Sequence, residues 1–154
     1  MKTPPLEKIY EAWSAAASGR VRVEKNDGDS GLAFVTSSDG EKVYSVAWRE
    51  NDWSSNDPAT WWQGDPGYPV IAVMFLIGRL PYDKEIATLF AGVNWNALNK
   101  KYKKNYAAAA FAAMRDLDMS TQTRELAVKT ASVAYEALMA SHIVVRRFSQ
   151  KRAS

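Results

Sequence analysis

An Asp-Gly pair between two stretches of strand-like sequence leaves this part of the chain few alternatives to a β-hairpin. Residues 32–37 and 42–49 flank Ser38-Asp39-Gly40-Glu41, and Asp-Gly in this setting strongly favours a tight two-stranded turn. Residues 20–25 alternate between apolar and charged side chains, as a half-buried strand does. In the last stretch, one face gathers Tyr44, Val46 and Trp48. The pattern predicts an antiparallel meander of three strands.

A helix is expected before this meander. Thr3 suits the N-cap position and Pro4 suits the first turn. Ser18-Gly19 is typical of a helix end. Between these two signals the apolar side chains repeat at helical spacing, at Leu6, Ile9, Tyr10 and Trp13.

The second half of the chain is predicted to be mostly helical. Residues 69–77 are almost entirely apolar and indicate a buried helix, with a buried strand as the alternative. Asp83, Asn94 and Ser120 are favourable N-caps, which predict helices over residues 83–92, 95–117 and 121–140. Residues 142–148 are rich in β-branched side chains and predict a final edge strand. The expected core draws on all of these elements: Leu6, Ile9, Trp13, Val21, Val23, Tyr44, Val46, Ile71, Phe75, Leu89, Leu98, Tyr102 and Leu138.

The expected fold class is therefore α+β: an N-terminal helix, a three- to four-stranded antiparallel sheet, and a helical C-terminal half with a final edge strand. A chain of 154 residues suits one domain, which we expect over residues 1–148, followed by a basic, flexible tail over 149–154. The chain has no cysteine, which excludes disulfides, thiolate nucleophiles and cysteine-based metal sites. No signal-peptide pattern is present, and the longest apolar run is too short to span a bilayer. We expect a soluble, cytoplasmic protein.

The charge distribution is uneven along the chain. Residues 1–99 contain 9 Lys and Arg against 13 Asp and Glu, whereas residues 100–154 contain 11 against 4. A strongly basic segment of this kind indicates contact with an acidic partner, although a dipolar surface without a partner is the alternative.

Two groups of basic residues carry this excess. The first is a group of four lysines within residues 100–104, which spans an arc of about 160° on a helical wheel. Its arc lies opposite the apolar and aromatic side chains of Trp95, Leu98, Tyr102 and Tyr106. Such an arrangement is typical of a solvated helix face, and it equally suits a phosphate backbone. The candidate polyanion-binding residues are Lys100, Lys101, Lys103 and Lys104 in the first group, and Arg146, Arg147, Lys151 and Arg152 in the second.

The connection over residues 50–68 is the second candidate site. It is longer than most loops, and it is rich in tryptophan and aspartate. Flat indole rings can stack on bases or sugars, or they can fold back to cover the sheet. Paired carboxylates beside aromatic rings are also the ingredients of a hydrolase cleft. The candidate residues are Trp53, Asp57, Trp61, Trp62 and Asp65.

No catalytic, cofactor or metal site is predicted from a motif. The one histidine, His142, has no Gly-x-Ser-x-Gly elbow to accompany it, and no glycine-rich phosphate loop is present. Residues 26–31 resemble the start of a calcium loop, but Ser38 stands where the loop needs a glutamate. Those residues are more typical of a turn between strands.

The helix segment 107–114 is apolar on every side and must be enclosed. Either other helices of the same chain cover it, or a second copy of the chain does, in a homodimer through Ala107, Phe111 and Met114. Taken together, the sequence favours a non-enzymatic binding protein that contacts nucleic acid or another polyanion through its basic C-terminal surface. The alternatives are a carboxylate-based enzyme centred on residues 50–68, and a structural or regulatory homo-oligomer.

Overall fold

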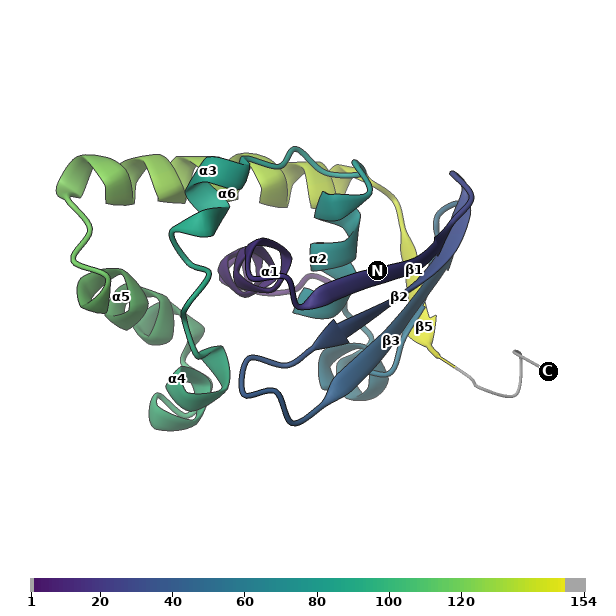
Figure 1. Cartoon of the computed structure of the whole chain (residues 1–154), viewed down its shortest axis with the longest axis horizontal. Coiled ribbons are helices and arrows are strands. Elements are labelled where there is room, and N and C mark those ends of the chain that lie inside the picture. Colours follow the sequence, from purple (N-terminus) through teal and green to yellow (C-terminus); the bar gives the residue numbers. More distant parts are fainter. Residues whose placement is uncertain (1, 149–154) are drawn as a thin grey trace.

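The computed structural model describes residues 2–148. It is an α+β fold in which a five-stranded sheet packs against a group of helices (Figure 1). The strands are β1 (Val21–Asn26), β2 (Ser30–Thr36), β3 (Val43–Arg49), β4 (Asp52–Ser55) and β5 (Val144–Arg147). The helices are α1 (Lys8–Ala17), the π-helix η1 (Ala59–Gln63), α2 (Tyr68–Leu76), α3 (Lys84–Thr88), α4 (Trp95–Lys101), α5 (Tyr106–Asp116) and α6 (Thr121–Ala140).

The sheet follows the chain order β1-β2-β3-β4-β5. The predicted three-stranded meander is confirmed: β1, β2 and β3 are antiparallel neighbours, and Thr36 pairs with Val43 beside the turn. The turn itself is closed by the Ser37 hydroxyl, which donates to the Asp39 carboxylate (2.6 Å), and Gly40 supplies a φ of 78°. The predicted final strand is also confirmed; it adds to β4 in parallel at the edge of the sheet.

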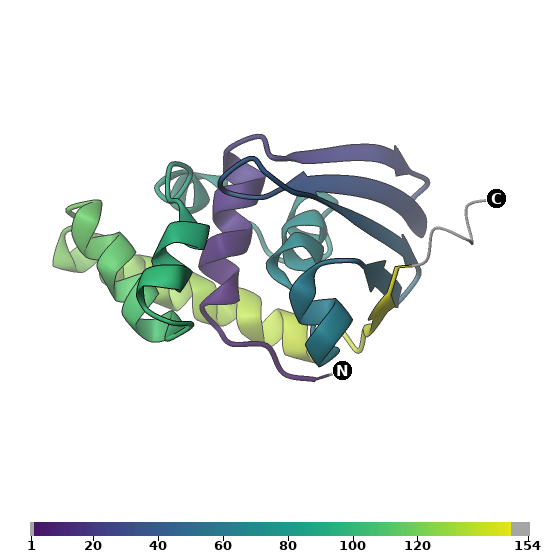
Figure 2. The ribbon, with the colours of Figure 1, turned by 90° about the horizontal axis from the view of Figure 1, so that it is seen from below.

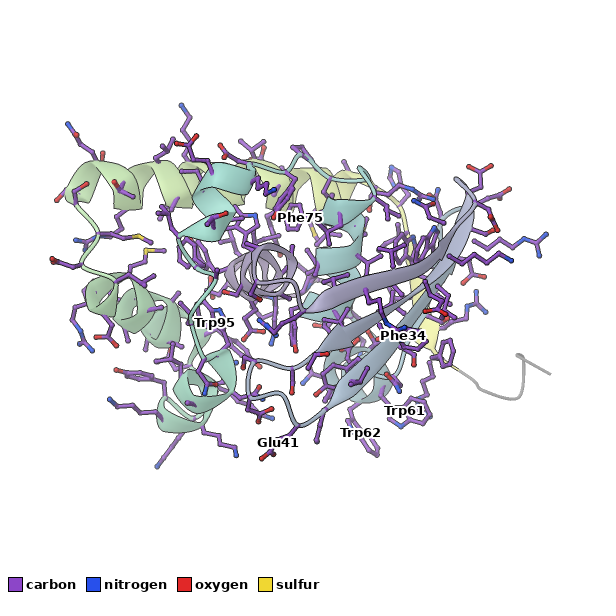
Figure 3. All side chains as sticks on the ribbon, in the orientation of Figure 1. Phe34, Glu41, Trp61, Trp62, Phe75 and Trp95 are labelled. Carbon is purple, nitrogen blue, oxygen red and sulfur yellow. The ribbon has the colours of Figure 1, made fainter. Side chains whose placement is uncertain are left out.

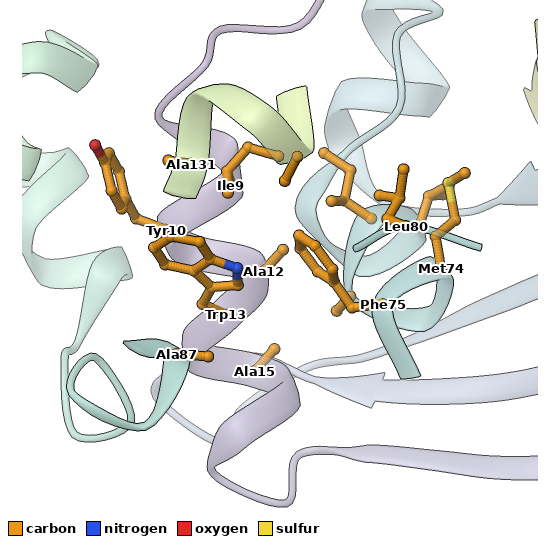
Figure 4. Close-up of a cluster of buried hydrophobic side chains, with 14 of the residues drawn as sticks. Ile9, Tyr10, Ala12, Trp13, Ala15, Met74, Phe75, Leu80, Ala87 and Ala131 are labelled. Atoms are coloured by element: carbon orange, nitrogen blue, oxygen red, sulfur yellow. The ribbon is translucent and has the colours of Figure 1, made fainter. Parts of the chain in front are cut away.

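Helix α1 lies at the centre of the molecule, and Figure 2 shows other helices and the sheet on several sides of it. Seven consecutive residues, from Ile9 to Ala15, are buried. Figure 4 shows Trp13 among side chains of α1, α2 and the segment around α3. The ring of Trp13 is fully buried and lies 5.7 Å from that of Phe90. Truncation of a buried aromatic side chain of this kind to alanine typically costs about 3–5 kcal/mol.

Two further helices complete the core. The apolar segment expected over 69–77 is α2, which packs between α1 and the sheet and buries every residue from Pro69 to Phe75. Helix α6 has the predicted bounds and begins with the Ser120 cap on the Thr123 amide (3.1 Å). It buries one face through Ala127, Ala131, Ala134 and Leu138, and the small side chains of the three alanines let α6 approach the core closely.

Several expectations for individual elements are wrong. Thr3 does not cap the first helix. Helix α1 begins at Lys8, four residues after the expected Pro4, and Glu7 occupies its N-cap position. The helix expected over 83–92 is the short α3. The helix expected over 95–117 is two helices, α4 and α5, because the chain turns at Lys103 and Lys104. Val23 and Leu89, expected in the core, are 38% and 41% exposed.

The long connection over 50–68 contains two elements of its own, β4 and η1. This explains its length, because a structureless loop of that size is uncommon in a compact fold. The expected tail, with Lys151 and Arg152, lies outside the described residues. Within residues 2–148, none of the helices is both long enough and apolar enough to cross a membrane.

Candidate functional site

A cleft of about 560 Å³ lies where α1, η1, the start of α2 and the α4–α5 connection meet. We call it the basic cleft, because lysines are its most numerous charged residues. Its lining comprises four lysines, four aromatic residues, two carboxylates and several amides. The principal side chains are Lys8, Glu11, Tyr44, Asp57, Trp62, Tyr68, Asn96, Asn99, Lys100, Lys103, Lys104 and Tyr106.

One stripe of α1 holds α4 and α5 in place beside the cleft. Lys8, Glu11 and Ser14 are spaced three residues apart and therefore share a helix face. The Trp95 indole donates to the Ser14 hydroxyl (2.7 Å), and the Asn99 amide donates to the Glu11 carboxylate. The Lys8 ammonium pairs with Glu11 (3.2 Å) and lies 4.5 Å from the centre of the Tyr106 ring. These contacts fix the wall that carries the lysines.

The turn between α4 and α5 brings those lysines to the cleft. The Lys104 amide donates to the Asn99 carbonyl and the Lys103 amide to the Lys100 carbonyl, which together form a Schellman motif. Lys103 and Lys104 adopt φ angles of 52° and 65°, a region in which glycine is favoured. Asn105 then caps α5 by accepting from the Ala108 amide (3.2 Å). Lys100, Lys103 and Lys104 line the cleft, whereas Lys101 packs near Tyr102.

Asp57 shapes the opposite wall. Its carboxylate accepts hydrogen bonds from the Ser55 hydroxyl and from both the amide (3.1 Å) and the hydroxyl (2.9 Å) of Thr60. The side chain is only 2% exposed. These bonds fix the start of η1. The structural role of Asp57 in this turn is therefore sufficient to explain why its carboxylate is buried here.

The two tryptophans of η1 face different surroundings. Trp62 is 77% exposed and lies at the edge of the basic cleft. Figure 3 shows it beside Trp61 at the lower margin of the molecule. The Arg147 guanidinium lies 5.0 Å from the centre of the Trp61 ring and donates to the Trp61 carbonyl (2.8 Å). An exposed indole next to lysines is available for stacking on a ligand.

The other two candidates of the 50–68 segment lie inside the fold. Trp53 is fully buried and stacks on Trp48 at 5.2 Å, so it has no surface to offer a ligand. Asp65 is buried too, and burial raises the pKa of its carboxyl. Neither residue lines the basic cleft.

The aromatic floor of the cleft consists of neutral phenols. Tyr44 and Tyr68 meet edge to face at 6.4 Å. Burial raises the pKa of both hydroxyl groups above the ordinary value, so both remain protonated at neutral pH. The formal charges of the lining come from four lysines against two carboxylates, which leaves the cleft positive.

The second basic group lies apart from the lysines. Arg146 forms an ion pair with Asp52 (2.7 Å), and Arg147 packs on Trp61. In Figures 1 and 2, β5 and α4 lie toward opposite ends of the molecule. The π-helix η1 lies between the two groups: it contacts β5 and also contributes residues to the cleft.

The alanine-rich helix α5 is covered by its own chain along one face. Met114 is buried, whereas Ala107 is exposed and Phe111 is 57% exposed beneath the Arg124 guanidinium (6.0 Å). His142 is exposed in the turn that follows α6. Across residues 2–148, no three histidine or carboxylate side chains gather closely enough to bind a metal ion.

The sequence pattern of one protein family matches residues 1–144. The chain belongs to the family described as uncharacterised conserved protein UCP014422. The segment shared with this family includes every residue of the basic cleft and stops before Arg146 and Arg147. Comparison with curated proteins and with solved structures finds no match.

The sequence of this family member indicates some residues of the basic cleft but not others. The sequence indicates the lysines at 100, 103 and 104 together with Asp57 and Trp62. It does not indicate Lys8, Glu11 or Asn99. A signal for Glu11 was present: the segment from Ile9 to Ala17 has only two polar residues, Glu11 and Ser14. A helix with so few polar residues must be enclosed, and a carboxylate enclosed with it requires partners.

Proposed function

We propose that this chain is a non-enzymatic binding protein that takes single-stranded nucleic acid in the basic cleft. The observation that carries the proposal is that Lys100, Lys103 and Lys104 share one cleft with the exposed Trp62. Lysine ammonium groups bind phosphates, and an indole face stacks on any base. In this proposal, parts of the two predicted candidate sites act together in one cleft.

The dimensions of the cleft favour single strands over duplexes. A volume of about 560 Å³ falls within the range of small-ligand pockets and suits one nucleotide unit. In a duplex the base faces are covered by stacking, so a base must leave the helix before it can reach Trp62. A flexible single strand presents its bases without that cost.

The neighbouring residues of η1 offer a continuation of the path. Trp61 directly precedes Trp62 in the chain and carries Arg147 on its ring. A strand that leaves the cleft past Trp62 therefore meets a further cation next to an aromatic ring. Arg146 is less available, because Asp52 neutralises it.

The test is a titration of fluorescently labelled single- and double-stranded oligonucleotides at several salt concentrations. Replacing Lys100, Lys103 and Lys104 together with alanine is expected to weaken single-strand binding and to make the salt dependence shallower. The slope of log affinity against log salt concentration is negative, and loss of three phosphate contacts reduces its magnitude by about 2. A protein without appreciable affinity for single strands contradicts the proposal.

A matched control separates the cleft from overall charge. Lys25, Lys84 and Lys129 are exposed and lie outside the cleft, so their triple alanine variant has the same net charge as the cleft variant. We expect this control to bind nearly as tightly as the unchanged protein. Equal losses in the two variants show instead that only net charge matters, and they contradict a role for the cleft.

The homodimer through Ala107, Phe111 and Met114 and the cytoplasmic location stay predictions. Of the three residues, Phe111 offers the largest exposed apolar surface. The carboxylate enzyme has weaker support, since the Asp57 carboxylate is engaged by Ser55 and Thr60.

A further inference from the structure

The lining of the basic cleft includes a nearly buried carboxylate, whose negative charge does not contribute to phosphate binding. Glu11 lines the cleft, and its side chain is only 5% exposed. It lies on the central helix α1 and accepts a hydrogen bond from Asn99 of α4. We infer that Glu11 accepts a hydrogen bond from an amino group on the bound base, and that the cleft therefore selects cytosine, adenine or guanine over thymine or uracil.

The hydrogen-bonding capacity of Glu11 is only partly used. A carboxylate offers about four acceptor positions on its two oxygens. The Lys8 ammonium occupies one on Oε2, and the Asn99 amide occupies one on Oε1. Both partners belong to the cleft wall and hold the carboxylate in a fixed orientation. These two partners leave acceptor positions of the carboxylate unused, and Glu11 is among the residues that line the cleft.

The lining of the cleft presents two kinds of chemistry. Lys100, Lys103 and Lys104 at the α4–α5 turn attract negative charge, whereas Glu11 accepts hydrogen bonds only. A matching ligand carries an anionic group for the lysines, a flat ring for Trp62 and a hydrogen-bond donor for Glu11. A nucleotide whose base carries an amino group has these three properties.

Thymine and uracil are poor partners for the Glu11 carboxylate. Their one ring N–H on the pairing edge lies between two carbonyl oxygens, and a carboxylate repels those oxygens. Cytosine and adenine instead present an amino group. Glutamate side chains accept a hydrogen bond from the amino group of cytosine in protein–DNA complexes. This inference rests on the proposed function, because it specifies which bases the same cleft prefers.

The first experiment compares oligo(dC) with oligo(dT) of equal length, for the unchanged protein and for Glu11→Gln. A hydrogen bond to a charged acceptor corresponds to about a tenfold preference for oligo(dC). Glu11→Gln is expected to reduce that ratio to about one, because its amide offers a donor as well as an acceptor. Glu7→Gln is the matched control: Glu7 precedes α1, lies outside the cleft, and should leave the ratio unchanged.

A second experiment needs no variant and so remains decisive if Glu11→Gln does not fold. Oligonucleotides in which cytosine is replaced by 2-pyrimidinone lack the amino group and add no bulk. The unchanged protein is expected to bind them about tenfold more weakly than oligo(dC).

The outcomes separate this inference from the proposed function. If neither homopolymer binds, the proposed function fails and the base preference fails with it. If both bind equally, or if Glu11→Gln weakens both by the same factor, the cleft binds nucleic acid without reading the base. Glu11 would then only hold Lys8 and Asn99, and the inference would be overturned.

Discussion

Gly67 and Asp57 approach each other more closely than any residue with a side chain at position 67 would permit. A Cβ atom added to Gly67 would overlap the Asp57 carboxylate. The backbone of Gly67 is extended, with φ −77° and ψ 170°, so any residue can adopt its conformation. The glycine is therefore required by space and not by backbone freedom.

We expect Gly67→Ala to lower the free energy of unfolding by about 2 kcal/mol, as overpacking in a filled site does. Urea denaturation measures this change. Gly92→Ala is the control, because a Cβ there meets no atom within 4 Å. In a double-mutant cycle with Asp57→Ala, the cost of Gly67→Ala should shrink by 1 kcal/mol or so. A cost that stays the same in both backgrounds would show that Asp57 is not the clashing group.

At the residue scale, the sequence reveals residue types that form unusual clusters, such as tryptophans and lysines. It does not reveal a residue whose role depends on burial and on tertiary contacts. Trp62 and Lys100 were identified because tryptophan and lysine clusters stand out in composition. Glu11 did not stand out, because its significance comes from burial beside Asn99, which lies 88 positions away in the chain. No local pattern encodes that contact.

The break between α4 and α5 is the main difference between prediction and structure at the scale of elements. The four lysines from Lys100 to Lys104 are good helix formers, and neither glycine nor proline marks the end of α4. The signal that was present is Asn105, whose side chain caps α5. The chain ends α4 with Lys103 in a left-handed conformation that costs a lysine about 1 kcal/mol or more.

We therefore expect Lys103→Gly to stabilise the fold by about 1 kcal/mol while it weakens nucleic-acid binding. Lys103→Ala removes the same charge but keeps the unfavourable backbone conformation, so it should weaken binding without stabilising the fold. Thermal denaturation of the two variants provides the comparison. Equal melting temperatures for glycine and alanine would contradict strain at this turn.

Other elements were predictable because their signals are local. The meander follows from Asp39-Gly40 and alternating side chains, and α6 follows from Ser120 and the helical repeat after it. In contrast, β4 is only four residues long, and its parallel partner β5 lies some ninety residues further along the chain. Pairing at such separation is decided by the packing of the whole chain.

At the scale of the whole molecule, the basic cleft is a product of the tertiary arrangement. It joins α1, η1, α2 and the α4–α5 turn, whose residues extend from Pro5 to Tyr106. The sequence predicted an acidic partner and an aromatic wall as separate features. Their convergence on one cleft could not be predicted, because it depends on where α1 places α4.

The most direct test of this convergence uses the six indole N–H signals in a ¹H–¹⁵N correlation spectrum. During titration with a short oligo(dC), the signal of the exposed Trp62 should shift strongly. The signals of Trp13, Trp48, Trp53 and Trp95 should move little, because these rings are buried. The account predicts that shifted backbone signals cluster around the basic cleft. A titration that leaves Trp62 and the cleft lysines unchanged while other surfaces respond would contradict it.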